Sequence, residues 1–214
     1  MVADDSAGLG LTPTPDTGER LSPVRVWDEA TRPVRPAPPP GAVYSRRGRL
    51  IGGHLIEVHD HLRGELARVR DLVRQVREGA AGAADARSAI NEMTMRHNDW
   101  ALGAYCASYC RFVTGHHLLE DEAVFPHLRE RDESLGPVID RLAGEHKIIH
   151  QVLNDVDQAL VDHLRDPADY AGLQQAVDVL TDTLLSHLAY EEADRKSTRL
   201  NSSHELKSRM PSSA

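Results

Sequence analysis

The chain has 214 residues, enough for one domain with tails, and its hydrophobic content of 40% with only 4% aromatic residues suits aliphatic helix packing better than a β-sandwich. The formal net charge of −8 argues against nucleic acid as the main partner, because phosphate binding needs a basic face. With two cysteines, no apolar run of about 18 residues and no signal-peptide layout at the N-terminus, we expect a cytoplasmic protein that does not enter a membrane.

Residues 1–48 form a proline-rich arm that we expect to be disordered. Eight of the twelve prolines lie in it, and it ends in the run Pro38-Pro39-Pro40. Proline fixes φ and lacks an amide hydrogen, so this segment cannot sustain a helix. We therefore assign the arm no part in the core.

Two amphipathic segments follow the arm. In residues 50–77, apolar side chains recur at steps of three and four, which places them on one face of a helix. A Gly/Ala-rich spacer at residues 78–84 separates this helix from a second, which runs through residues 100–116 and should stop or bend near Pro126.

Two further helices are marked by proline at their starts. Pro137 suits the first turn of the third helix, and Pro167 opens the fourth. Four apolar stripes joined by short loops are buried most simply in an up-down-up-down bundle. We therefore predict an all-α four-helix bundle over residues 49–193.

Residues 194–214 look foreign to the rest of the chain. The stretch from Asp194 to His204 resembles the in-frame translation of a common sequencing-library adapter, and residues 208–214 resemble its far end. The alternative is an ordinary serine-rich disordered terminus. We exclude this tail from the predicted fold as non-native and expect the native fourth helix to continue differently beyond Ala193.

Histidine is the outlier in the composition, with twelve residues. Each predicted helix carries one histidine on its apolar stripe, and two of these are followed one turn later by a glutamate on the same face. The four histidines are His59, His116, His146 and His187, and the two glutamates are Glu120 and Glu191.

Six such groups inside one bundle point to metal. An unpaired buried carboxylate costs several kcal/mol and an unpaired imidazole roughly 1–3 kcal/mol, and a cation removes that cost. Nitrogen and oxygen ligands without thiolate favour iron or manganese over structural zinc. Six side chains are too many for one ion that keeps an open position, so they suit two octahedral ions joined by bridging carboxylates and an oxo or hydroxo group.

The run HHLLEDEAVFP at residues 116–126 resembles the HHxxE signature, followed by Phe-Pro, of the hemerythrin-like HHE cation-binding domain family. Residues 59–63, 142–146 and 187–192 resemble the motifs of the other three helices, so the likeness covers roughly residues 50–193. The resemblance implies a non-haem centre of two iron ions, with both glutamates as candidate bridges. The implied ligands are His59, His116, Glu120, His146, His187 and Glu191.

Two departures separate the chain from oxygen-carrying hemerythrins. Those have HxxxH on the third helix, where this chain offers only His146 and His150, and a five-residue His-to-Asp step on the fourth, where it has His187 and Glu191. The pattern is closer to the family branch with six protein ligands. More open coordination makes simple reversible oxygen carriage a weaker expectation.

The other histidines are weaker candidates for the metal centre. His150 and His54 remain open as additional ligands. His117, turned about 100° from the preceding histidine, is expected to support the ligands together with Asp121 rather than to bind metal. We expect His61 to be solvated, and three others to lie on the surface, namely His97, His127 and His163.

The resemblance implies an iron protein that binds or senses oxygen, peroxide or nitric oxide, so its partner would be a small diatomic molecule or peroxide. Two alternatives stay open. One is a di-iron enzyme with catalase-like peroxide removal or iron–sulfur repair activity. The other is an iron-responsive helical interaction module. Protein partners and the oligomeric state are not specified by the sequence.

Overall fold

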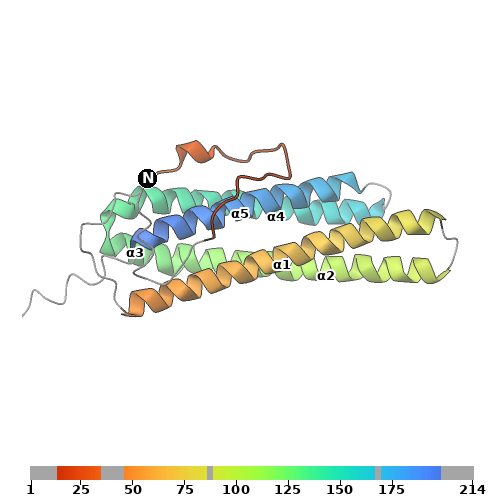
Figure 1. The fold of residues 1–214 in the computed structure, drawn as a ribbon, viewed down its shortest axis with the longest axis horizontal. Helices are drawn as coiled ribbons and strands as arrows, with labels where there is room; N and C mark the ends of the chain where they lie inside the picture. The colour runs from red at the N-terminus through yellow and green to blue at the C-terminus, as the bar shows by residue number, and fades with distance from the viewer. Residues whose placement is uncertain (1–13, 35–45, 86–88, 167–169, 199–214) are drawn as a thin grey trace, which may run out of the picture.

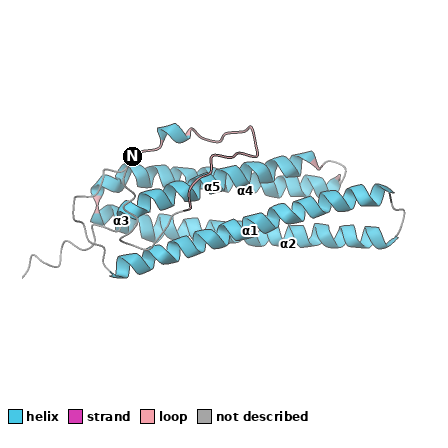
Figure 2. Cartoon of the chain, viewed as in Figure 1, coloured by secondary structure: helices cyan, strands magenta, loops and turns pink. Residues whose placement is uncertain are grey.

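The structure, a computed structural model, describes residues 14–34, 46–85, 89–166 and 170–198. Four long helices lie side by side and alternate in direction (Figure 1), and the described residues contain no strand (Figure 2). The predicted all-α, up-down-up-down bundle is thereby confirmed. The helices are α1 (Arg46–Asp85), α2 (Ala89–Leu119), α4 (Gly136–Arg165) and α5 (Ala171–Thr198).

Helix α1 is longer than the sequence pattern indicated. The Gly/Ala-rich residues 78–84, predicted to be a spacer, continue the helix as far as Asp85. Alanine has the highest helix propensity of all residues, and the four alanines here outweigh the two glycines. The turn to α2 therefore lies beyond the spacer.

Helix α2 ends ahead of Pro126, as predicted. Its last α-helical residue is Leu119, a π-helical turn spans Glu120–Val124, and the short α3 (Phe125–Arg131) follows with the proline in its first turn. Proline cannot donate to the helix ladder and clashes with the carbonyl four residues earlier, and the wider turn accommodates this break.

The start of α4 also agrees with the sequence-based prediction. Asp132 caps the 3₁₀ turn Glu133–Leu135 by accepting a hydrogen bond from the Ser134 amide at 3.1 Å, and Pro137 lies in the first turn of α4. Pro167 lies outside the described residues. Helix α5 extends to Thr198, so the helical backbone enters the stretch that we excluded from the fold, and residues 199–214 also lie outside the described part.

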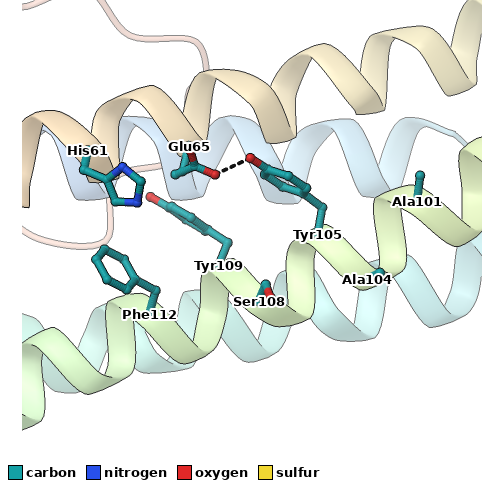
Figure 3. Close-up of a pocket in the computed structure, with 8 residues that line it drawn as sticks. All are labelled: His61, Glu65, Ala101, Ala104, Tyr105, Ser108, Tyr109 and Phe112. Carbon is teal, nitrogen blue, oxygen red and sulfur yellow. Dashed lines mark hydrogen bonds between the residues drawn. The ribbon is translucent and has the colours of Figure 1, made fainter.

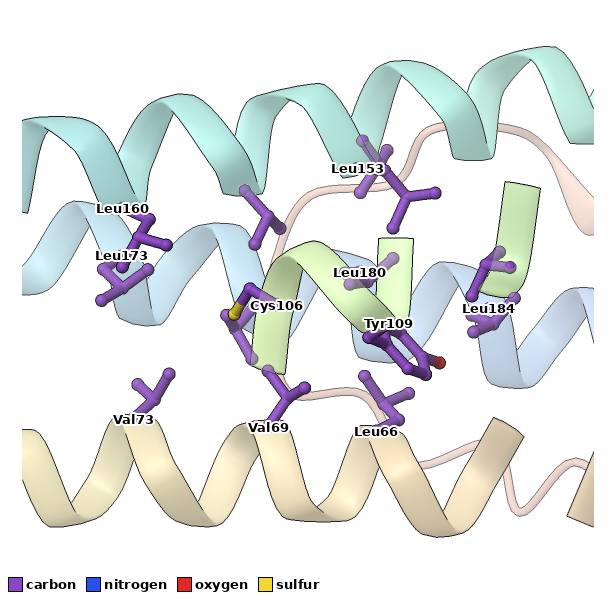
Figure 4. Packing of buried hydrophobic residues seen from close by; sticks show 14 of the residues in the cluster. Leu66, Val69, Val73, Cys106, Tyr109, Leu153, Leu160, Leu173, Leu180 and Leu184 are labelled. Carbon is purple, nitrogen blue, oxygen red and sulfur yellow. The ribbon is translucent and has the colours of Figure 1, made fainter. Parts of the chain in front are cut away.

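The apolar core is divided by a polar layer. A long cluster of leucine and valine side chains from all four helices fills the bundle from Leu62 to Val76 of α1 and along the facing parts of the other helices (Figure 4). Burying each of these leucines contributes about 1.5–3 kcal/mol. A smaller cluster next to α3 closes the opposite end of the bundle. It consists of Phe125, Leu135, Val138, Ile139 and Leu142.

Residues 14–34, here called the N-terminal segment, differ from the disorder expected of the arm. The segment runs along α5 on the outside of the bundle (Figure 1). Its Leu21 and Ser22 amides donate to Asp182 at 2.9 Å, and the Tyr190 hydroxyl donates to the Pro33 carbonyl at 2.8 Å. Acidic and hydroxyl groups of α5 thus provide partners for an extended backbone, a conformation that proline does not oppose. Residues 1–13 and 35–45 lie outside the described part.

Within the described residues, no helix combines the length and the apolar character needed to span a bilayer.

Candidate metal centre

Seven side chains with metal-binding atoms gather in the polar layer between the two apolar clusters. They form two groups, and within each group the ligand atoms lie within 4.8 Å of one another. One group contains His117, His146 and His187, and the other contains His59, His116, Glu120 and Glu191. The structure therefore brings together all six residues predicted from the sequence and adds His117.

The group of four is built from three helices and the π-helical turn. His59 of α1 and His116 of α2 place their Nε2 atoms 3.2 Å apart. The Oε2 atom of Glu191 lies 3.4 Å from the Nε2 atom of His59, and Glu120 lies 3.6 Å from His116. All four side chains are turned away from water; His116 is the most exposed of them at 8%.

Both glutamates also reach the other group. The Oε2 atom of Glu120 is 3.6 Å from the Nε2 atom of His146 as well as from that of His116. The Oε2 atom of Glu191 is 3.8 Å from the Nε2 atom of His187 as well as near His59. Each carboxylate thus stands between a histidine of one group and a histidine of the other, which is the position that a bridging ligand occupies.

Three histidines of the centre turn their Nδ1 atoms outward to carboxyl groups, and their Nε2 atoms remain inward. The pairs are His59 with Glu192 at 2.9 Å, His146 with Asp121 at 2.9 Å and His187 with Glu145 at 3.0 Å. An ionised carboxylate can only accept, so a neutral histidine beside one carries its proton on Nδ1 and presents a lone pair on Nε2. Metal-binding histidines are oriented in this way.

Two of these outer carboxylates are kept ionised. Burial alone would raise the pKa of Glu145, but hydrogen bonds from His187, Arg32 and Arg141 lower the pKa to about 2. Burial also opposes ionisation of Glu192, and hydrogen bonds from His59, the Thr14 amide and Arg63 lower its pKa below the ordinary value. Both carboxylates can therefore fix the tautomer of the histidine that they contact.

His117 is the residue whose role the sequence analysis missed. Its side chain is 1% exposed, and neither ring nitrogen has a hydrogen-bond partner in the described part of the chain. Burial and the neighbouring His146 and His187 lower the pKa of His117 well below its usual value, so the ring is neutral and offers a lone pair. Its ring stacks on that of His146 with the centroids 4.0 Å apart.

The position of α2 explains why two consecutive histidines both face inward. Helix α2 packs against α1 on one side and α4 on another. Adjacent residues of a helix are about 100° apart. His116 therefore faces His59 of α1, and His117 faces His146 of α4. The consecutive pair at 116–117 was the only available signal, and its meaning depended on having a partner helix on each side.

The remaining described histidines lie outside both groups. The ring of His150 is half-buried with its centroid 6.1 Å from that of His117, and His54 is exposed beside Glu57. His163, expected on the surface, is buried against Tyr170 with the ring centroids 6.0 Å apart. The side chain of His97 is outside the described part.

His61 faces away from the centre, as predicted. It lines a groove of about 540 Å³ between α1 and α2, where its ring meets Phe112 edge-on (Figure 3). In the same groove the Tyr105 hydroxyl donates to Glu65, whereas the Tyr109 hydroxyl donates to the Leu62 carbonyl at 3.3 Å. None of the seven inward-facing residues lines this groove.

The donor set suits metal binding. Five imidazoles and two carboxylates supply nitrogen and oxygen donors without thiolate, a set that fits iron or manganese. The ring nitrogens of His117 are buried and have no hydrogen-bond partner in the described structure. The same holds for the Nε2 atom of His187. Phe125 stacks against His146 at a centroid distance of 5.4 Å and closes the polar layer on the α3 side.

Comparison with known families agrees with this geometry. The model of the hemerythrin HHE cation-binding domain matches residues 51–196. No curated protein and no solved structure matches the chain significantly. Because the match covers more than half of the sequence and includes all seven residues, the chain belongs to the hemerythrin HHE cation-binding family.

Proposed function

We propose that this chain is a non-haem di-iron protein that binds or senses oxygen, peroxide or nitric oxide. The observation that carries the proposal is the position of Glu120 and Glu191, each within 4 Å of a histidine from both ligand groups. Two adjacent groups of ligands joined by two carboxylates suit two ions rather than one. The cytoplasmic location remains a prediction from the sequence.

The division of ligands follows from the same distances. His117, His146 and His187 would hold one iron, and His59 with His116 would hold the other. When bound, a ferrous pair supplies electrons and an open coordination position for a small ligand. Seven ligands would leave fewer open coordination positions on the metal ions than the predicted six. Reversible binding of a small ligand is therefore a stronger expectation than it was from the sequence pattern.

The protein itself contributes orientation and a dry environment. The outer carboxylates accept from Nδ1 of His59, His146 and His187, so these three of the five imidazole donors are aimed before metal arrives. Buried Leu62, Leu184 and Leu188 on one side and Phe125 on the other exclude bulk water from the layer. Exclusion of water protects a reactive bound ligand from side reactions.

The test is metal analysis and absorption spectroscopy on protein purified without oxygen, before and after exposure to air. We expect about two irons per chain and an oxo-to-iron charge-transfer band after oxidation. His116→Ala and Glu120→Ala should abolish the band, and His61→Ala, in the outer groove, should leave it unchanged. Iron content below one per chain, or a reduced protein inert toward oxygen, peroxide and nitric oxide, would contradict the proposal.

The decay of the oxidised spectrum separates binding from turnover. A stable spectrum that reverses when oxygen is removed indicates a binding protein. Continuous consumption of peroxide indicates the enzymatic alternative. Both measurements use the same iron-loaded protein.

A further inference from the structure

The N-terminal segment reaches the metal centre through one arginine. Arg32 donates from Nε to Oε1 of Glu145 at 2.8 Å and from Nη2 to Oε2 at 2.9 Å, so both carboxylate oxygens are held at once. The two side chains are only 10% and 1% exposed. A bidentate, largely buried arginine–carboxylate pair fixes orientation as well as charge.

Arg32 is itself held in place from several sides. Its guanidinium lies over the rings of Tyr190 and Trp27, at 4.6 and 5.4 Å from the ring centroids, and donates to the Ser186 Oγ at 3.0 Å. Stacking on two aromatic faces restricts the rotation of a long side chain. The segment therefore presents a rigid donor to α4, not a solvated charge.

The carboxylate that Arg32 holds is the one that orients a ligand. Oε2 of Glu145 accepts the Nδ1 proton of His187 at 3.0 Å, and the same oxygen accepts from Nη2 of Arg32. Arg141, from the same helix as Glu145, adds one hydrogen bond to Oε1 at 2.7 Å. Without Arg32, Arg141 alone would hold the carboxylate by one oxygen, and the group could rotate away from His187.

We propose that Arg32 is a positioning residue of the metal centre, acting through Glu145 on His187, and that the N-terminal segment is thereby part of the centre. The proposal rests on the proposed function, because it concerns a ligand of the group formed by His117, His146 and His187. The segment has a second, weaker link of the same kind. The Thr14 amide donates at 2.8 Å to Glu192, which accepts from His59.

The experiment is a titration of the metal-free protein with Co²⁺, whose d–d absorption reports the coordination of each ion. Wild-type protein should bind two equivalents. Arg32→Gln should weaken one equivalent on the order of 10-fold and alter its d–d spectrum while leaving the other unchanged, since losing a group that orients a ligand typically costs 10–100-fold in affinity. Arg25→Gln is the matched control, because this arginine of the same segment contacts Asp182 at 3.9 Å and not Glu145.

A double variant separates positioning from general attachment of the segment. If Arg32 acts through Glu145, Arg32→Gln should cause no further loss in a Glu145→Gln background. Losses that add, or a lowered melting temperature with unchanged Co²⁺ affinity, would assign Arg32 a purely structural role and overturn this proposal alone. A wild-type protein that binds no Co²⁺ would overturn the proposed function and, with it, this inference.

Discussion

His59 and His116 hold their Nε2 atoms 3.2 Å apart, although 57 residues separate them in the chain. The Nδ1 atom of His59 faces outward to Glu192 at 2.9 Å, so a neutral His59 that donates there presents a lone pair toward His116. The two rings stand edge to face at an interplanar angle of 82°. Two helices thus bring two candidate ligand nitrogens together by packing alone.

His117 should be needed for one of the two ions. We expect His117→Ala to reduce the iron content from about two per chain to about one, because the ring supplies one of three nitrogen donors in its group. Inductively coupled plasma analysis of anaerobically loaded protein measures this directly. His150→Ala is the control, since this half-buried ring lies outside both groups, and a loss of iron in the control variant alone would reverse the assignment.

The buried ring of His117 should destabilise the metal-free bundle. A buried imidazole without a hydrogen-bond partner costs about 1–3 kcal/mol. We therefore expect His117→Leu to raise the melting temperature of the apoprotein by several degrees in thermal denaturation followed by circular dichroism. An unchanged or lower melting temperature would mean that the ring is satisfied in the apoprotein.

Metal should stabilise the fold. Ferrous iron at about 100 times its dissociation constant contributes about 2.7 kcal/mol per site, and in a domain of this size about 1 kcal/mol shifts the melting temperature by roughly 2–4 °C. Differential scanning calorimetry should therefore show a rise of at least about 5 °C that a chelator reverses. The variant His59→Ala/His187→Ala, which removes a donor from each group, should show no rise.

The Cys106 thiol should be inert in the folded protein. Burial, with smaller contributions from Cys110 and Asp157, raises its pKa to about 12. The folded state therefore favours the neutral thiol, and this contribution to stability is fully present below the unfolded pKa of about 8.5 and is lost as the pH rises toward 12. At pH 8 only about one molecule in ten thousand carries the thiolate.

Mass spectrometry after iodoacetamide treatment measures how fast each of the two cysteines reacts. Cys110, only half-buried and also raised in pKa by burial, should react first, and Cys106 should react only on unfolding. Rapid alkylation of Cys106 at pH 8 in folded protein would show that the core opens locally around α2.

Truncation in the long apolar cluster should be costly. Leu184, which is 0% exposed, belongs to this cluster (Figure 4). We expect Leu184→Ala to lower the free energy of unfolding by about 2–5 kcal/mol, through lost burial and the cavity left behind. Urea denaturation measures the change. Leu119→Ala, at a side chain 60% exposed on α2, should change it by less than about 0.5 kcal/mol.

The sequence by itself determined the four helices and six inward-facing residues. Apolar side chains at helical spacing define a buried stripe whatever the partner helix is, and a histidine or glutamate on that stripe must share its environment. Prolines 126 and 137 marked helix boundaries because their effect on the backbone is local. The pairing of His187 with Glu191 was visible for the same reason, since four residues make one turn.

Only the tertiary structure decided the features that depend on contacts between distant residues. His117 became a member of the centre because α4 lies on the second side of α2, and no periodicity of α2 records that. Arg32 contacts Glu145 across 113 residues, and the Thr14 amide contacts Glu192 across 178. The proline-rich arm was predicted to hold no helix, but a 3₁₀ turn forms at Glu29–Thr31 and α1 begins at Arg46, three residues before the predicted boundary. Propensity describes only the local backbone, whereas the hydrogen bonds of the N-terminal segment supply donors to buried carboxylates of the bundle.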